Sequence, residues 1–131
     1  MIRNIGKHVR HIKNVVVSIL RERNKVKKRS PEWIAIRGWY LHHFPKCAAC
    51  GIDKLLQVHH KIPFHDRPDL ELVDTNLITL CMSKNECHLR IGHGDNWKAY
   101  NPDVAKDSEI LFKNPDMRYE YEQKAKAMRV A

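Results

Sequence analysis

The chain has 131 residues, which is enough for one domain of ordinary size and too few for two. Hydrophobic residues make up 43% of it, yet no uninterrupted apolar run approaches the roughly 20 residues that a membrane span needs. We therefore expect no membrane contact. The formal net charge of +9 is distributed unevenly along the chain.

The excess positive charge lies in an N-terminal arm, residues 1–29. This arm holds ten Lys and Arg residues and one acid, Glu22, whereas the rest of the chain is neutral by charge count. Such an arm favours a polyanionic partner bound through sequence-independent phosphate contacts, the alternative being a solvated helix face. Apolar residues recur at steps of three and four over residues 4–23, which predicts a helix there. The candidate phosphate-binding residues are Arg21, Arg23, Lys25, Lys27, Lys28, Arg29 and, outside the arm, Lys61.

A second helix is predicted from Ser30-Pro31-Glu32 to a point before Pro45. Serine is a favoured N-cap, proline is favoured at the first helical position, and an acid is favourable in the first turn. This helix contains Trp33 and Tyr40, so we expect it to bury an aromatic face.

The middle of the chain is predicted to form two strands and a short helix. Leu55 to Ile62 is a strand ended by Pro63, and Leu77 to Leu80 is a second strand. Residues 64–75, rich in Asp and Pro, form the loop between them, and residues 86–91 form a short helix ended by Gly92.

The last part of the chain, residues 103–131, is predicted to be a helical tail that packs back on the domain. Asn101-Pro102 marks a turn before it. We assign this tail no chemistry and divide the chain into an arm (1–29), a domain (30–102) and the tail. The helical stripe in the tail is formed by Met117, Tyr121, Ala125 and Met128.

Four cysteines bracket the predicted strands in a C-x2-C and C-x5-C arrangement. The N-terminus lacks an apolar stretch typical of a signal peptide, so we expect a reducing cytoplasm, where four cysteines favour a metal over disulfides. A structural Zn²⁺ held by four thiolates would clip the ends of this small unit together. The alternative is reduced, buried cysteines without a ligand. The four are Cys47, Cys50, Cys81 and Cys87.

His59 and His60 are adjacent near the end of the first predicted strand. Neighbours on a regular strand point to opposite faces, so both can serve one site only where the strand ends or twists. One histidine would then bind a metal while the other, free, takes a proton from water. The alternative is one ring buried in the core and one ring in solvent.

These motifs together resemble the HNH nucleases, whose ββα-metal fold is shared with colicin-type DNases. The resemblance spans about residues 30–102 and rests on the order of its motifs, Val58-His59-His60-Lys61-Ile62-Pro63, then Asn76-Leu77-Ile78-Thr79-Leu80-Cys81, then Cys87-His88. Residues 88–102 resemble small HNH proteins of bacteriophages and prophages most. The resemblance implies an α+β fold, in which a small ββα-metal core is clipped by a four-cysteine zinc site and flanked by N- and C-terminal helices.

The resemblance also implies a role for each histidine and for Asn76. His59 and His88 would bind a catalytic divalent ion, His60 would act as the general base, and Asn76 would brace the loop that bears the base. His93 departs from the family pattern, because five residues on an α-helix turn about 500° and leave it about 140° out of phase with His88. His93 can be a third ligand only if the helix stops at Gly92; otherwise it contacts phosphate or packs against the tail.

The activity implied is metal-dependent endonuclease cleavage of DNA to 5′-phosphate and 3′-hydroxyl ends. The catalytic ion would be Mg²⁺, Mn²⁺, Ni²⁺ or Zn²⁺, and the partner would be double-stranded DNA in the cytoplasm of a bacterial host cell. Two alternatives stay open. One is a zinc-stabilised nucleic-acid-binding module with vestigial activity, and the other is an accessory nuclease that works with the terminase or portal proteins of a phage DNA-packaging complex.

Overall fold

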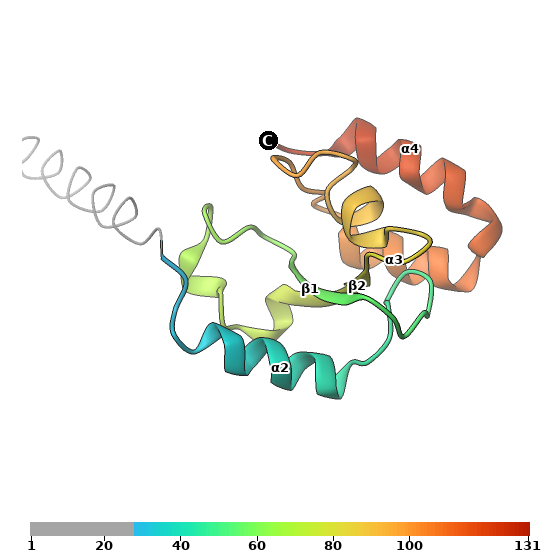
Figure 1. The fold of residues 1–131 in the computed structure, drawn as a ribbon. Coiled ribbons are helices and arrows are strands. Elements are labelled where there is room, and N and C mark those ends of the chain that lie inside the picture. Colours follow the sequence, from blue (N-terminus) through green and yellow to red (C-terminus); the bar gives the residue numbers. More distant parts are fainter. Residues whose placement is uncertain (1–27) are drawn as a thin grey trace, which may run out of the picture.

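The computed structural model describes residues 28–131. The predicted helix over residues 4–23 and the candidates Arg21, Arg23, Lys25 and Lys27 therefore lie outside the described residues. Within residues 28–131 the chain forms three α-helices and a two-stranded sheet, so the α+β class predicted from the sequence is confirmed (Figure 1). No helix in this part of the chain is long and apolar enough to cross a membrane.

Helix α2 (Trp33–His43) packs against one face of the sheet (Figure 1). The predicted N-cap at Ser30 is wrong, because the helix begins at Trp33 with Glu32 at the N-cap position and no side-chain cap. The Ser30 hydroxyl instead accepts a hydrogen bond from the Glu32 amide (3.2 Å) in the turn that precedes the helix. Tyr40 is buried, and its hydroxyl donates a hydrogen bond to the Leu77 carbonyl oxygen at 2.9 Å. The helix thus buries an aromatic residue against the strands, as the sequence predicted.

Strands β1 (Leu56–His60) and β2 (Leu77–Cys81) pair antiparallel, with Leu56 opposite Cys81 and His60 opposite Leu77. Both lie inside or within one residue of the predicted strands. The loop between them contains two short 3₁₀ turns, η1 (Pro68–Leu70) and η2 (Asp74–Asn76). Every residue of β2 is buried, because α2 covers one face of the sheet and the segment after Cys87 covers the other.

The opposite face of the sheet is covered by η3 (His88–Gly92), a single π-helical turn, together with the two C-terminal helices. The predicted short helix is thus present at this place, but with a wider turn than an α-helix. Leu80, Ile91 and Leu111 meet with the cysteines in the larger of two hydrophobic clusters among the described residues.

Helices α3 (Val104–Lys113) and α4 (Arg118–Met128) follow, joined by the 3₁₀ turn η4 (Pro115–Met117). Helix α4 corresponds to the predicted stripe, and its Ala125 is fully buried, whereas Met128 is half exposed. Helix α3 also lies within the predicted helical tail, but the sequence did not predict that the tail is divided into two helices. Both helices contact η3 and each other, so the tail packs back on the domain as expected (Figure 1).

Candidate metal centres and active site

The four cysteines meet at one point on the side of the sheet that faces η3. Cys47 and Cys50 come from the turn after Pro45, Cys81 ends β2, and Cys87 directly precedes η3. Their sulfur atoms all lie within 4.8 Å of one another, and those of Cys50 and Cys81 are 3.7 Å apart. Sulfur atoms at the corners of a tetrahedron around Zn²⁺ would be about 3.8 Å apart, given a Zn–S bond of about 2.3 Å. The cluster therefore fits a structural zinc ion.

The acidities of the thiols also fit a metal site. A hydrogen bond from the Cys87 thiol lowers the pKa of Cys47 to about 5, and the same hydrogen bond raises the pKa of Cys87. Burial raises the pKa of Cys50. The cluster therefore favours a thiolate at Cys47 and protonated thiols at Cys50 and Cys87, and a bound cation would favour ionisation of those two.

His59, His88 and His93 form a second cluster, with one ring nitrogen of each lying within 4.8 Å of those of the others. His59 reaches it from β1, His88 begins η3, and His93 directly follows η3. The buried Nε2 of His59 has no hydrogen-bond partner within residues 28–131. An unpartnered polar atom at this depth is costly, so this nitrogen is placed where it could bind a ligand from outside the protein chain.

The hydrogen bonds of His88 and His93 also favour a cation between their Nε2 atoms. The Nδ1 atom of His88 lies 2.6 Å from Oε1 of Gln57, and that of His93 lies 2.7 Å from the Ala99 carbonyl oxygen. Both partners are acceptors, so each Nδ1 carries the proton and each Nε2 presents a lone pair. These two Nε2 atoms are 3.2 Å apart, a spacing that suits two ligands of one ion and leaves two lone pairs in contact without one.

Burial also keeps the three imidazoles in the form that binds metal. It lowers the pKa of His59 well below the usual value, lowers that of His93, and lowers that of His88 to about 4. The proximity of the other histidines lowers the pKa values of His59 and His88 further. The rings are therefore neutral at pH 7, as metal ligands must be.

The π-helical turn explains how His93 reaches this cluster. An α-helix would leave His93 out of phase with His88, but an i to i+5 turn closes after about five residues and brings the two rings to the same side. The turn ends at Gly92, and His93 follows with φ of −113° and ψ of −2°. The structure thus meets the condition under which His93 can join His59 and His88.

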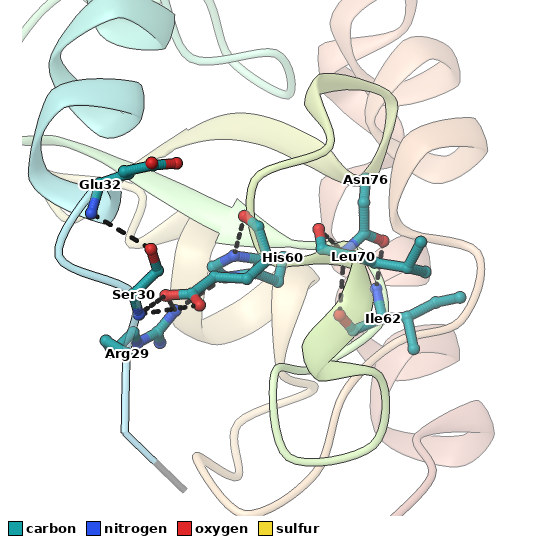
Figure 2. Close-up of polar contacts among 8 residues, drawn as sticks. Arg29, Ser30, Glu32, His60, Ile62, Leu70 and Asn76 are labelled. Carbon is teal, nitrogen blue, oxygen red and sulfur yellow. Dashed lines mark hydrogen bonds and ion pairs between the residues drawn. The ribbon is translucent and has the colours of Figure 1, made fainter. Parts of the chain in front are cut away.

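His60, the predicted base, lies on the other side of β1 from His59. Its ring packs at a tilt of 34° against the ring of Trp33, with centroids 4.5 Å apart. Its Nε2 donates a hydrogen bond to the Glu71 carbonyl oxygen at 3.0 Å (Figure 2). This bond places the proton on Nε2 and leaves a lone pair on Nδ1. Burial lowers the pKa of His60, so Nδ1 is unprotonated at neutral pH.

Arg29 lies beside that lone pair, with Nη1 3.5 Å from Nδ1 of His60 (Figure 2). Its guanidinium is 5.0 Å from the ring centroids of both Trp33 and Phe64. Glu71, only 4% exposed, forms an ion pair with Arg29 at 3.8 Å and accepts hydrogen bonds from the Ser30 amide at 3.1 and 3.2 Å. The last basic residue of the arm is therefore fixed beside the predicted base.

Asn76 joins the two ends of the loop between the strands (Figure 2). Its Oδ1 accepts a hydrogen bond from the Ile62 amide at 3.0 Å, and its Nδ2 donates one to the Ile62 carbonyl oxygen at 3.1 Å. A second donation from Nδ2, at 3.4 Å, reaches the Leu70 carbonyl oxygen. The side chain thus spans the loop that follows His60, where the family resemblance placed a bracing asparagine.

A cavity of about 310 Å³ is lined by the three clustered histidines, by His60 and by Arg29. His59 and His60 point to opposite faces of β1, yet both line it, because the strand ends at His60. Among the described phosphate-binding candidates Arg29 lines the cavity, whereas Lys28 and Lys61 do not. The half-exposed Trp97 lies at its edge, with its ring centroid 4.8 Å from that of His93.

Sequence reasoning missed Gln57, Glu71 and Ala99. Gln57 lies two residues before His59 on the same strand, so it shares the face of His59, and this spacing was a usable signal. Glu71 and Ala99 contact the histidines through backbone carbonyl oxygens, which side-chain patterns do not reveal.

Two antiparallel strands followed by a helical turn, with histidines on the first strand and on the turn, define a ββα-metal domain. Residues 47–94 match the family model described as HNH endonuclease. The family resemblance seen in the sequence is thus confirmed for residues 47–94, which are similar to HNH endonucleases. Searches among curated proteins and among solved structures gave no match.

Proposed function

We propose that the protein is a metal-dependent endonuclease that hydrolyses phosphodiester bonds in DNA. The observation that carries this proposal is the pair of Nε2 lone pairs on His88 and His93, 3.2 Å apart, in the same cavity as the unprotonated Nδ1 of His60, beside which Arg29 lies. The two Nε2 atoms are suited to bind a cation, and Nδ1 of His60 is suited to accept a proton. Hydrolysis of a phosphodiester needs both.

In the proposed reaction His60 accepts a proton from the attacking water at Nδ1. The water oxygen bonds to phosphorus, the bond from phosphorus to the 3′ oxygen breaks, and the products carry a 5′ phosphate and a 3′ hydroxyl. A divalent ion held by His59, His88 and His93 would supply Lewis-acid stabilisation of the charge on the phosphate and the leaving oxygen. Glu71, through its carbonyl oxygen, holds the His60 ring in the tautomer that can accept the proton.

The polyanionic substrate is supported by the charge around the cavity. Arg29 and Lys98 line it, and the residues that precede Arg29 contain most of the excess positive charge of the chain. Arg29 is oriented by two aromatic rings and a buried carboxylate, so it can contact a phosphate without first losing side-chain freedom. Lys28 and Lys61 lie outside the cavity lining and suit contacts with flanking phosphates.

The test is nicking of a supercoiled plasmid by the wild-type chain and by His60→Ala. We expect the wild type to nick in Mg²⁺, Mn²⁺ or Ni²⁺ and not in EDTA, and His60→Ala to lose about 10²-fold or more of the rate while still binding DNA and metal. His65→Ala is the matched control, because His65 lines the same cavity but its exposed ring contacts Asp66. Full activity of His60→Ala would refute the assigned base.

The same assay separates the rival functions. Binding of the plasmid without nicking in all three metals would identify a nucleic-acid-binding module with a vestigial site. The resemblance of residues 88–102 to phage and prophage HNH proteins supports a setting in a phage-infected bacterial cytoplasm. If nicking requires the large subunit of a packaging motor, the protein is an accessory nuclease of that complex.

A further inference from the structure

Arg118, the first residue of α4, reaches the cysteine cluster from a part of the chain to which the sequence assigned no chemistry. Its Nη1 lies 3.4 Å from the sulfur of Cys87, and its Nη2 donates a hydrogen bond to the Asn85 carbonyl oxygen. The side chain is 22% exposed, and its Nε contacts the Glu122 carboxylate at 2.8 Å. The guanidinium is therefore oriented by fixed partners and points one donor at a buried sulfur atom.

The charge of the cluster explains why a cation at this place matters. Four thiolates around one Zn²⁺ have a net charge of about −2, and a buried charge without a partner is costly. A hydrogen bond from a cationic donor to a thiolate offsets part of that cost and is stronger than a neutral one. Glu122 also contacts Arg90 at 3.7 Å, so its negative charge is shared between two arginines.

Helix α4 also holds the other end of the segment that contains the metal-binding side chains. Arg129, directly after the helix, donates a hydrogen bond to the Gly94 carbonyl oxygen at 2.6 Å, and Lys126 contacts Asp95 at 3.2 Å. The segment from Asn85 to Asp95 is thus attached to α4 at both ends. Arg118 therefore contacts the cysteine cluster from a helix that is attached to both ends of this segment.

We propose that Arg118 is a positioning residue for the zinc site, and that its guanidinium donates a hydrogen bond to the sulfur of Cys87 and slows the loss of the ion. The C-terminal helix is then part of the metal centre as well as of the hydrophobic core. The inference rests on zinc occupying the four cysteines and is independent of DNA cleavage.

The test measures the rate at which zinc passes from the full-length, zinc-loaded protein to an excess of the chromophoric chelator 4-(2-pyridylazo)resorcinol. We expect Arg118→Gln to release zinc about tenfold faster than the wild type, as loss of one hydrogen bond to a charged group predicts. Arg118→Lys keeps the charge but loses the forked geometry, so its rate should fall between the two. Arg90→Gln is the matched control, because Arg90 shares the Glu122 carboxylate but contacts Glu86 in place of a sulfur atom.

A second readout separates a contact with sulfur from a general effect on folding. In the Co²⁺-substituted protein, loss of the donor to Cys87 should shift the thiolate-to-metal charge-transfer absorption to lower energy in Arg118→Gln and leave it unchanged in Arg90→Gln. If Arg118→Gln does not fold, Arg118→Lys undergoes both measurements in its place. Wild-type release rates and spectra in both Arg118 variants would overturn the role of Arg118, and a wild-type protein purified without zinc would overturn the zinc site itself.

Discussion

Gly92 lies where the ring of His59 meets η3. A Cβ atom at this position would be 3.2 Å from Nδ1 and Cε1 of the His59 ring and 3.1 Å from Cδ1 of Leu80. These contacts are tighter than ordinary packing, so the absence of a side chain allows the ring to approach the other two histidines.

We expect Gly92→Ala to displace the His59 ring and weaken ion binding at the histidine cluster by about tenfold, with a loss of roughly 1–3 kcal/mol of stability from overpacking. Isothermal titration with Ni²⁺ and thermal unfolding measure the two effects. Gly38→Ala is the control, because nothing lies within 4 Å of its Cβ position on α2, and alanine there should stabilise by about 1 kcal/mol. Equal effects of the two substitutions would contradict the role of Gly92.

The places of His59, His60, His88 and Asn76 could be predicted from the sequence because their order follows a family motif, and their roles in the chemistry stay predictions. The partners of those residues could not, since Glu71 and Ala99 act through backbone oxygens whose positions depend on the fold. Arg29 was predicted only as one of many basic residues of the arm. Its place beside His60 depends on the buried Glu71 carboxylate, 42 residues away in the chain.

At the scale of elements, the strands and α2 follow directly from local patterns in the sequence. Alternating or continuous apolar residues end at Pro45 and Pro63, so their limits could be read closely. The side of the turn on which His93 lies could not be predicted in this way. An α-helix would place His93 out of phase with His88, whereas η3 is a π-helical turn. Helix α3 was predicted only as part of a helical tail, without a buried face of its own, because that face includes Asp107 and Ser108, which weaken its apolar pattern.

The basic N-terminal arm is predicted to supply much of the affinity for DNA. Removal of residues 1–27 deletes eight Lys and Arg residues, so we expect weaker DNA binding and a flatter dependence of the binding constant on salt. In the full chain Arg29→Gln should lower the slope by at most about one phosphate contact and reduce the cleavage rate more than affinity. Fluorescence anisotropy over a range of salt concentrations, together with plasmid nicking, measures both. An unchanged slope after the truncation would show that the arm does not bind phosphates.

At the scale of the whole molecule, we assign one candidate metal centre to the support of the fold and the other to the proposed chemistry. Three of the four cysteines are fully buried within the larger hydrophobic cluster, whereas the three histidines line a cavity. Three cysteines are themselves members of the larger hydrophobic cluster in residues 28–131. We therefore expect the zinc ion to contribute much of the folding free energy.

We therefore expect elemental analysis to find one tightly held zinc ion and one ion that dialysis against EDTA removes. Cys50→Ser should lose the tightly held ion and much of its thermal stability. His88→Ala should lose only the exchangeable ion and unfold near the wild-type temperature in EDTA. Metal content and circular dichroism melting measure these outcomes, and retention of the tight ion by Cys50→Ser would contradict the division.

Cys87 and His88 are consecutive residues at the start of η3. An ion bound by the cysteines restricts the backbone from which His88 projects, so the histidines lose less freedom when they bind their own ion. Thermodynamic linkage makes this assistance reciprocal, since any factor by which zinc tightens the histidine site also applies to zinc when that site is filled. A protein with an ion bound at the histidine site should therefore also release its structural zinc most slowly.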